Sequence, residues 1–203
     1  MKKILLSLLY FISTQLALCQ NTNEFRFGAY FRDNSKKELS ITPSPISEAK
    51  VELNLLLPEK PCVFFYIKNQ FSKIYTPNQL PEFFFYFTDE NDNRSVSPKE
   101  VRQITINYPF LYAKSPEDFV LVRLFKSKSG NERLLRLEKE KYLIGIKFIP
   151  LAVDTIPFIS IPIKNSNSFK VIPESKIPIG DYGFILKSPS PQGLVVYDFS
   201  IED

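Results

Sequence analysis

The sequence predicts an all-β fold: an antiparallel β-sandwich of roughly ten short strands, with at most one or two short helical turns, after an N-terminal signal peptide. Three observations support this prediction. Apolar residues alternate with polar ones or form short runs of strand length. The chain has 16 prolines against 6 glycines in 203 residues, which disfavours long helices. Hydrophobic residues make up 44% and charged residues 24%, as in a globular protein with a sizeable core.

Residues 1–19 have the organisation of a secretory signal peptide. Lys2 and Lys3 form the basic start, and the apolar stretch that follows is too short to span a bilayer. Cleavage after Cys19 would leave Gln20 as the mature N-terminus, whereas lipidation of Cys19, as at a bacterial lipobox, would anchor the protein; a retained, uncleaved segment is the third alternative. The sequence thus predicts export to the periplasm or the extracellular space, with lipid anchoring at Cys19 as the minority interpretation.

Residues 20–203 are predicted to form a single β-sandwich domain. Removal of residues 1–19 lowers the basic count from 26 to 24 against 22 acidic residues, and the charges are mixed along the chain. No basic stripe marks a nucleic-acid surface, so we expect no nucleic-acid partner. Cys62 is the one cysteine left, which excludes an intramolecular disulfide, and the apolar run beside it predicts a buried, inert thiol.

The N-terminal half contains five expected strands. Residues 24–32 alternate, with Phe25, Phe27, Ala29 and Phe31 on one face. The others are residues 51–57, 62–67, 83–87 and 102–107. Residues 51–57 have apolar side chains at alternating positions, and residues 62–67 are a continuous apolar run. The aromatic run at 83–87 is typical of a central strand that packs on both faces, so we interpret it as core and not as a ligand platform. Residues 43–48 are the loosest stretch of the chain.

The C-terminal half contains six further expected strands, which turn residues separate: 119–125, 142–149, 156–163, 169–172, 182–186 and 194–201. Residues 131–141 have high helix propensity but no long apolar stripe, so a strand that ends in a charged turn is as good an interpretation. Residues 97–100, Ser-Pro-Lys-Glu, resemble a capping box and predict one short helical turn.

Residues 81–201 resemble a group of uncharacterised exported bacterial proteins. The shared pattern is an aromatic Phe-Tyr-Phe strand (85–87), a Ser-Pro-x-x-Phe strand entry (115–119), and a closing hairpin of the type Pro-Gly-Glu-Tyr-Ala-Phe then Phe-Asp-Phe-Gly-Val. In this chain Asp181 replaces the Glu, Gly183 the Ala and Ser200 the final Gly, and Ile179 intervenes before Gly180. The resemblance implies a fold type and an exported location, and no reaction.

The closing hairpin also has a purely physical interpretation. Gly180 allows a positive φ at the turn before the strand. Tyr182 is expected to bury its ring while its hydroxyl finds a backbone partner, as tyrosines at strand corners of sandwiches do. We therefore predict structural roles for Gly180, Tyr182 and Phe199.

One segment has the spacing of a twelve-residue calcium loop. Oxygen donors stand at positions 1, 3, 5, 7 and 9 from Asp89, and Glu100 occupies position 12. However, Arg94 stands at position 6, where such loops have glycine, and a strand precedes the loop in place of a helix. A solvated connection between two strands is the alternative, and the sequence leaves both open.

The functional prediction follows largely from what the composition excludes. Without histidine the chain has no Ser-His-Asp triad, no Cys-His dyad and no usual zinc site, and two cysteines cannot hold an iron–sulfur cluster. We predict a non-catalytic exported β-sandwich protein, with no catalytic residue, metal or cofactor, that acts through an unknown protein partner in the bacterial envelope or as a structural accessory. The alternatives are a carbohydrate-binding or adhesion module and a hydrolase that uses paired carboxylates. No transmembrane helix is expected in the mature chain.

Overall fold

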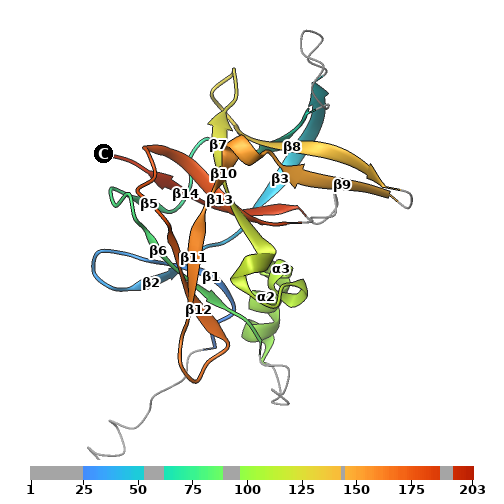
Figure 1. Ribbon diagram of the computed structural model, residues 1–203. Helices are drawn as coiled ribbons and strands as arrows, with labels where there is room; N and C mark the ends of the chain where they lie inside the picture. Colours follow the sequence, from blue (N-terminus) through green and yellow to red (C-terminus); the bar gives the residue numbers. More distant parts are fainter. Residues whose placement is uncertain (1–24, 53–61, 89–96, 143–144, 188–193) are drawn as a thin grey trace, which may run out of the picture.

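The computed structural model describes residues 25–52, 62–88, 97–142, 145–187 and 194–203 (Figure 1). The predicted signal peptide with Cys19, residues 53–57 of one expected strand and residues 89–96 of the proposed calcium loop lie outside the described residues. Within them the prediction of a mostly β, antiparallel fold is confirmed. The prediction of a sandwich is confirmed only in part, because one of the two sheets closes into a barrel.

The strands of the N-terminal half are β1 (Gly28–Arg32), β2 (Glu38–Ser40), β3 (Ser44–Glu52), β4 (Cys62–Ile67), β5 (Tyr75–Thr76) and β6 (Glu82–Tyr86). Two short helices and a 3-10 turn follow: α2 (Pro98–Ile106), α3 (Pro109–Tyr112) and η1 (Pro116–Asp118). The C-terminal half holds β7 (Phe119–Lys126), β8 (Arg133–Tyr142), β9 (Gly145–Pro150), η2 (Ala152–Asp154), β10 (Thr155–Ile156), β11 (Phe158–Pro162), β12 (Ser168–Pro173), β13 (Gly180–Leu186) and β14 (Val195–Ile201).

The smaller sheet has five strands in the order β11-β12-β6-β1-β2. The larger sheet runs β10-β7-β13-β14-β3-β4-β8-β9, with β5 parallel to β14. Its β7 and β8 also pair, at Phe125 with Leu134 and Lys126 with Arg133, so the strands β7, β13, β14, β3, β4 and β8 form a closed ring. Figure 1 shows the smaller sheet with α2 and α3 beside it, and the β8–β9 hairpin that projects from the barrel. Closure removes edge strands that would otherwise remain exposed.

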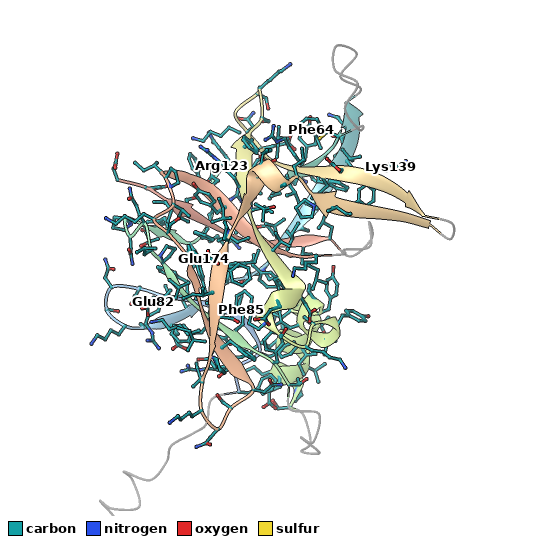
Figure 2. All side chains as sticks on the ribbon, in the orientation of Figure 1. Phe64, Glu82, Phe85, Arg123, Lys139 and Glu174 are labelled. Atoms are coloured by element: carbon teal, nitrogen blue, oxygen red, sulfur yellow. The ribbon has the colours of Figure 1, made fainter. Side chains whose placement is uncertain are left out.

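Two hydrophobic cores share the strands β7, β13 and β14. One lies between these strands and the smaller sheet and contains Phe83, Phe85 and Phe184, each 0% exposed; Figure 2 labels Phe85 there. The other fills the barrel, with Val122, Ile185 and Val196 pointing inward. Because both faces of β13 and β14 are covered, nearly all their residues are buried, whereas β7 exposes Arg123 and Lys126. The four phenylalanines of the run at 83–87 in and beside β6 are also buried, so the prediction that this run is core is confirmed.

The closing hairpin forms as the sequence predicts. Gly180 has φ +152°, and β13 pairs with β14 from Gly180–Ile201 to Phe184–Tyr197. The ring of Tyr182 is 0% exposed, and its hydroxyl donates to the carbonyl of Pro178 at 2.9 Å. A buried phenol is thus satisfied by the backbone at the strand corner.

Two local predictions are wrong. Residues 102–106 form the end of α2 and Asn107 caps it, in place of the expected strand, because the capping box at Ser97 and Glu100 starts a helix that continues to Ile106. The Ser97 amide donates to the Glu100 carboxylate at 2.7 Å, and Asn107 closes the helix. The stretch at 43–48 is not loose, because all of it after Pro43 belongs to β3. Of the two alternatives left open at residues 131–141, the strand is the one observed, as β8.

Candidate functional site

One mouth of the barrel is open, and a bulge in β3 lies at this mouth. Ile46 stands opposite Ile67, and Ala49 stands opposite Phe65, so three steps along β3 match two along β4. The register shift lies between Ile46 and Glu48, where the Ser47 hydroxyl donates to the Tyr66 carbonyl at 3.0 Å. A bulge of this kind keeps both flanking residues on the inner face. The small methyl of Ala49 therefore occupies a position where a larger side chain would fill the barrel.

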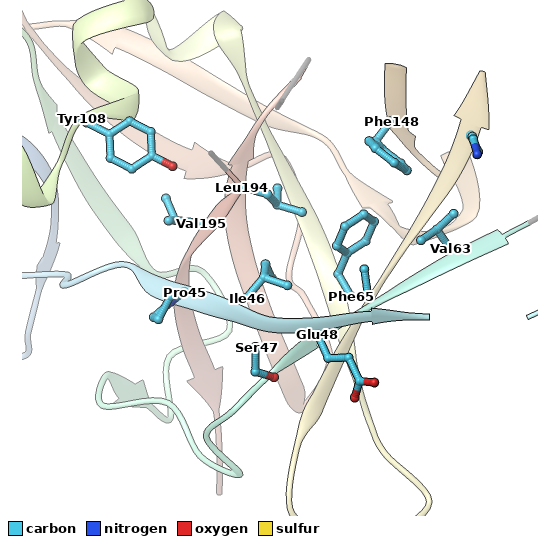
Figure 3. Close-up of a pocket in the computed structure, with 12 residues that line it drawn as sticks. Pro45, Ile46, Ser47, Glu48, Val63, Phe65, Tyr108, Phe148, Leu194 and Val195 are labelled. Carbon is cyan, nitrogen blue, oxygen red and sulfur yellow. The ribbon is translucent and has the colours of Figure 1, made fainter. Parts of the chain in front are cut away.

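The open mouth is a pocket of about 520 Å³ (Figure 3). Its floor consists of barrel-core side chains, and polar groups stand among the other lining residues; the lining is Pro45, Ile46, Ser47, Glu48, Ala49, Val63, Phe65, Tyr108, Lys139, Phe148, Leu194 and Val195. Tyr108 comes from the start of α3 and faces the pocket from the side opposite Phe148 (Figure 3). Volumes of this size and apolar linings with a few polar groups are typical of small-molecule sites, including barrel mouths.

The charges at the mouth are not balanced. The Glu48 carboxylate forms an ion pair with Lys50 at 3.0 Å, and this contact raises the pKa of the Lys50 ammonium. Lys139 lies on the inward row of β8 after Leu135 and Leu137, and its ammonium has no ion pair or hydrogen bond to another described residue. Burial raises the pKa of the Tyr108 phenol, with a smaller contribution from Tyr112, so this group stays neutral over the physiological range.

The opposite part of the barrel holds a buried ion pair. The Arg133 guanidinium, 0% exposed, lies 2.7 Å from the carboxylate of Asp198, which is 4% exposed. Arg133 also donates through Nε to the Asn69 carbonyl at 2.8 Å. Its Nη1 has no hydrogen-bond partner in the described part of the chain. The Ser200 hydroxyl donates to Asp181 at 2.5 Å close by on the same inner face. These groups cross-link strands β8, β13 and β14 inside the barrel.

A second polar cluster covers the outer face of the smaller sheet. The Glu38 carboxylate accepts from Arg26 at 2.5 Å, from Arg32 at 2.7 Å and from the Tyr86 hydroxyl at 2.6 Å. Burial acts to raise the pKa of Glu38, but the hydrogen bonds from Tyr86 and Arg32 and the positive charges outweigh it and hold that pKa below its ordinary value. Burial, together with the Glu38 contact, raises the pKa of Tyr86 to about 12.

This cluster predicts a loss of stability in alkali. The folded-state pKa of Tyr86 lies above its ordinary value of 10.0, so the stabilising contribution is complete below that pH and is lost as pH rises toward about 12. The Tyr86 side chain is only partly buried, so solvent screens the interaction and we expect the wild type to lose only about 1 kcal/mol more than Tyr86→Phe between about pH 9 and about pH 12. Urea unfolding at both pH values measures the difference. Tyr75→Phe, at a ring that is 69% exposed, is the control; parallel losses in wild type and Tyr86→Phe would contradict the assignment.

The residues that the sequence singled out do not meet in one site. Asp89 lies outside the described residues, and the Glu100 carboxylate caps α2. The described residues contain no group of three or more acidic, Cys or His side chains placed to hold a metal ion. Cys62 is half-buried at the start of β4, so the prediction of a buried thiol is wrong, and its inertness stays a prediction. Calcium binding by the loop at 89–100 stays a prediction, since residues 89–96 lie outside the described residues.

Neither the pocket nor the buried ion pair was predicted from the sequence. The signal for the pocket was a lysine that interrupts the alternating leucines at 135 and 137, but the helix alternative at residues 131–141 obscured it. For Arg133 and Asp198 no local signal existed, because 65 positions separate them along the chain. Only strand pairing brings them together.

The fold and pocket define a mostly β protein in which a small barrel with an open apolar mouth packs against a second sheet. Comparison with protein-family models, with curated proteins and with solved structures finds no match to this chain. Among the described residues no helix has the length and apolar character that a bilayer crossing requires.

Proposed function

We propose that this chain is an exported, non-catalytic binding protein of the bacterial envelope, and that the barrel mouth is its binding site. The observation that carries the proposal is the open pocket of about 520 Å³ over barrel-core side chains. Protein interiors are normally filled to crystal-like density, so an apolar cavity of this size at the end of a small barrel favours an occupant over a purely structural role. Export rests on the signal-peptide pattern of residues 1–19.

The side chains at the mouth support binding without catalysis. The Ser47 hydroxyl is engaged by a backbone carbonyl and the Glu48 carboxylate by Lys50, so neither is positioned as a nucleophile or base. Among the described residues Glu38 and Glu82 are two carboxylates that share one cation, since Arg32 bridges them at 2.7 and 3.8 Å. A glycosidase needs one carboxyl with a raised pKa, whereas the pKa of Glu38 is lowered.

Filling the pocket is expected to abolish binding of an apolar probe. Ala49 is exposed on the inward row opposite Phe65, so Ala49→Phe places a ring in the mouth without displacing core atoms. We expect the neutral probe N-phenyl-1-naphthylamine to bind the wild type saturably, and its affinity to fall at least about tenfold in Ala49→Phe. Fluorescence titration measures both. Ala152→Phe, on the exposed η2 turn, is the matched control.

The outcomes separate clearly. Binding by wild type and Ala152→Phe but not by Ala49→Phe supports the barrel mouth as the site. Equal binding by all three proteins, or no saturable binding by the wild type, would remove the proposal. A thermal melt of each variant confirms that loss of binding does not reflect loss of the fold.

A further inference from the structure

We infer that the pocket takes a single-chain amphipathic anion, with its apolar tail in the barrel mouth and its acidic headgroup at Lys139. This inference rests on the proposed function of the pocket and names the class of ligand. The inference follows from one feature of β8. Lys139 lies on the same face of this strand as the apolar side chains that pack inside the barrel.

The inward row of β8 is Arg133, Leu135, Leu137 and Lys139. The pairing of β8 with β4 places Leu135 opposite Phe65 and Leu137 opposite Val63, and all four are barrel-core residues. Two cations thus bracket an apolar segment. Burying an unpaired charge is unfavourable because the charge loses its hydration. For Arg133 the carboxylate of Asp198, at 2.7 Å, compensates this loss. No described residue does the same for Lys139.

Among the described side chains, the charge that a ligand would meet at the mouth is therefore positive. Glu48 is the acidic residue of the lining, and Lys50 neutralises it at 3.0 Å. Lys139 is half-buried at the pocket wall, and Figure 2 places it along β8 toward the projecting hairpin. A partly desolvated ammonium gains more from a charge-assisted hydrogen bond than one in bulk water. An anionic headgroup supplies the acceptor that the described residues do not provide for Lys139.

The apolar lining decides what the rest of the ligand is. A hydrophilic anion would make no apolar contact with the floor of the pocket, whereas a neutral hydrocarbon would give the Lys139 ammonium no hydrogen-bond acceptor. The floor consists of Val63, Phe65, Phe148 and Leu194. A diacyl lipid has two chains and exceeds a pocket of about 520 Å³. The free single-chain carboxylate, of the fatty-acid type, matches both features of the site, and we commit to it over the same chemistry presented in a membrane.

The test compares ligands that share one tail. Dodecanoate, dodecanol and dodecyltrimethylammonium are titrated as competitors of N-phenyl-1-naphthylamine on the purified full chain, the two ionic ligands below their critical micelle concentrations and dodecanol below its solubility limit. We expect dodecanoate to bind at least about tenfold more tightly than dodecanol, and dodecyltrimethylammonium to bind most weakly. Lys139→Gln should equalise dodecanoate and dodecanol, and Lys139→Arg should restore the preference. Lys128→Gln, at an exposed turn position, is the matched control and should leave it intact.

Each result counts for or against the inference. Two results would contradict an anionic ligand and still leave the pocket as a binding site. One is equal affinity of the wild type for the three ligands, and the other is a preference for dodecanoate over dodecanol that persists in Lys139→Gln. Failure of every ligand and of the probe overturns the proposed function as well. Flotation with phosphatidylglycerol vesicles, together with no uptake of monomeric dodecanoate, would assign the site to membrane lipid and overturn the free ligand.

Discussion

Asp198→Asn is expected to lower the free energy of unfolding by about 3–5 kcal/mol. The substitution leaves the Arg133 guanidinium buried without its counter-charge, 2.7 Å from an amide in place of a carboxylate. Arg133 keeps only the Asn69 carbonyl as acceptor for Nε, and Nη1 already has no partner among the described residues. An isolated charge in the barrel interior has no compensation for its lost hydration, so the penalty is large.

Urea unfolding of wild type, Asp198→Asn and the double variant Arg133→Met/Asp198→Leu measures this effect. The double variant replaces both charges by apolar groups and should recover most of the loss, because well-packed apolar side chains often substitute for a buried ion pair. Asp203→Asn, at the exposed C-terminal end, is the matched control and should change stability by less than about 0.5 kcal/mol. A loss below about 1 kcal/mol for Asp198→Asn would show that Arg133 is solvated.

Phe85→Ala is expected to cost about 3–5 kcal/mol through cavity formation. The ring is 0% exposed and packs edge-on against Phe110, Phe119 and Phe184, with centroid distances of 5.3, 5.2 and 5.0 Å. These partners come from α3, β7 and β13, so Phe85 joins the smaller sheet to the barrel wall and to the helices. Few neighbouring groups can collapse into the space, because most are rings in fixed mutual contact.

Thermal and urea unfolding measure the loss, and the matched control is Phe71→Ala. Phe71 is 58% exposed, so its truncation should change stability by less than about 0.5 kcal/mol. Phe85→Leu, which removes less volume, should fall between wild type and Phe85→Ala. Comparable effects of Phe85→Ala and Phe71→Ala would contradict the assigned core. Two separate unfolding transitions in Phe85→Ala would show that the sheet and the barrel unfold independently.

Local pattern was sufficient for most elements. The strands at residues 62–67, 83–87, 119–125 and 182–186 are observed within about two residues of their expected ends, because alternation and aromatic runs are properties of a single segment. The hairpin that contains Tyr182 was predicted down to its backbone hydrogen bond. By contrast, the prediction of a strand at 102–107 is wrong. The capping box at Ser97 and Glu100 starts a helix, and the alternation of two isoleucines is too weak a pattern to favour a strand over it.

The amino-acid sequence by itself therefore determined the β character of the chain, most strand positions, the aromatic core and the corner at Tyr182. The tertiary structure alone decided that six strands close into a barrel, that the β3 bulge leaves Ala49 at an open mouth, and that Arg133 meets Asp198 while Lys139 lacks a partner among the described residues. The physical reason is that alternation along one strand fixes which side chains share a face. Which strand lies beside it depends on pairing between segments far apart in the chain.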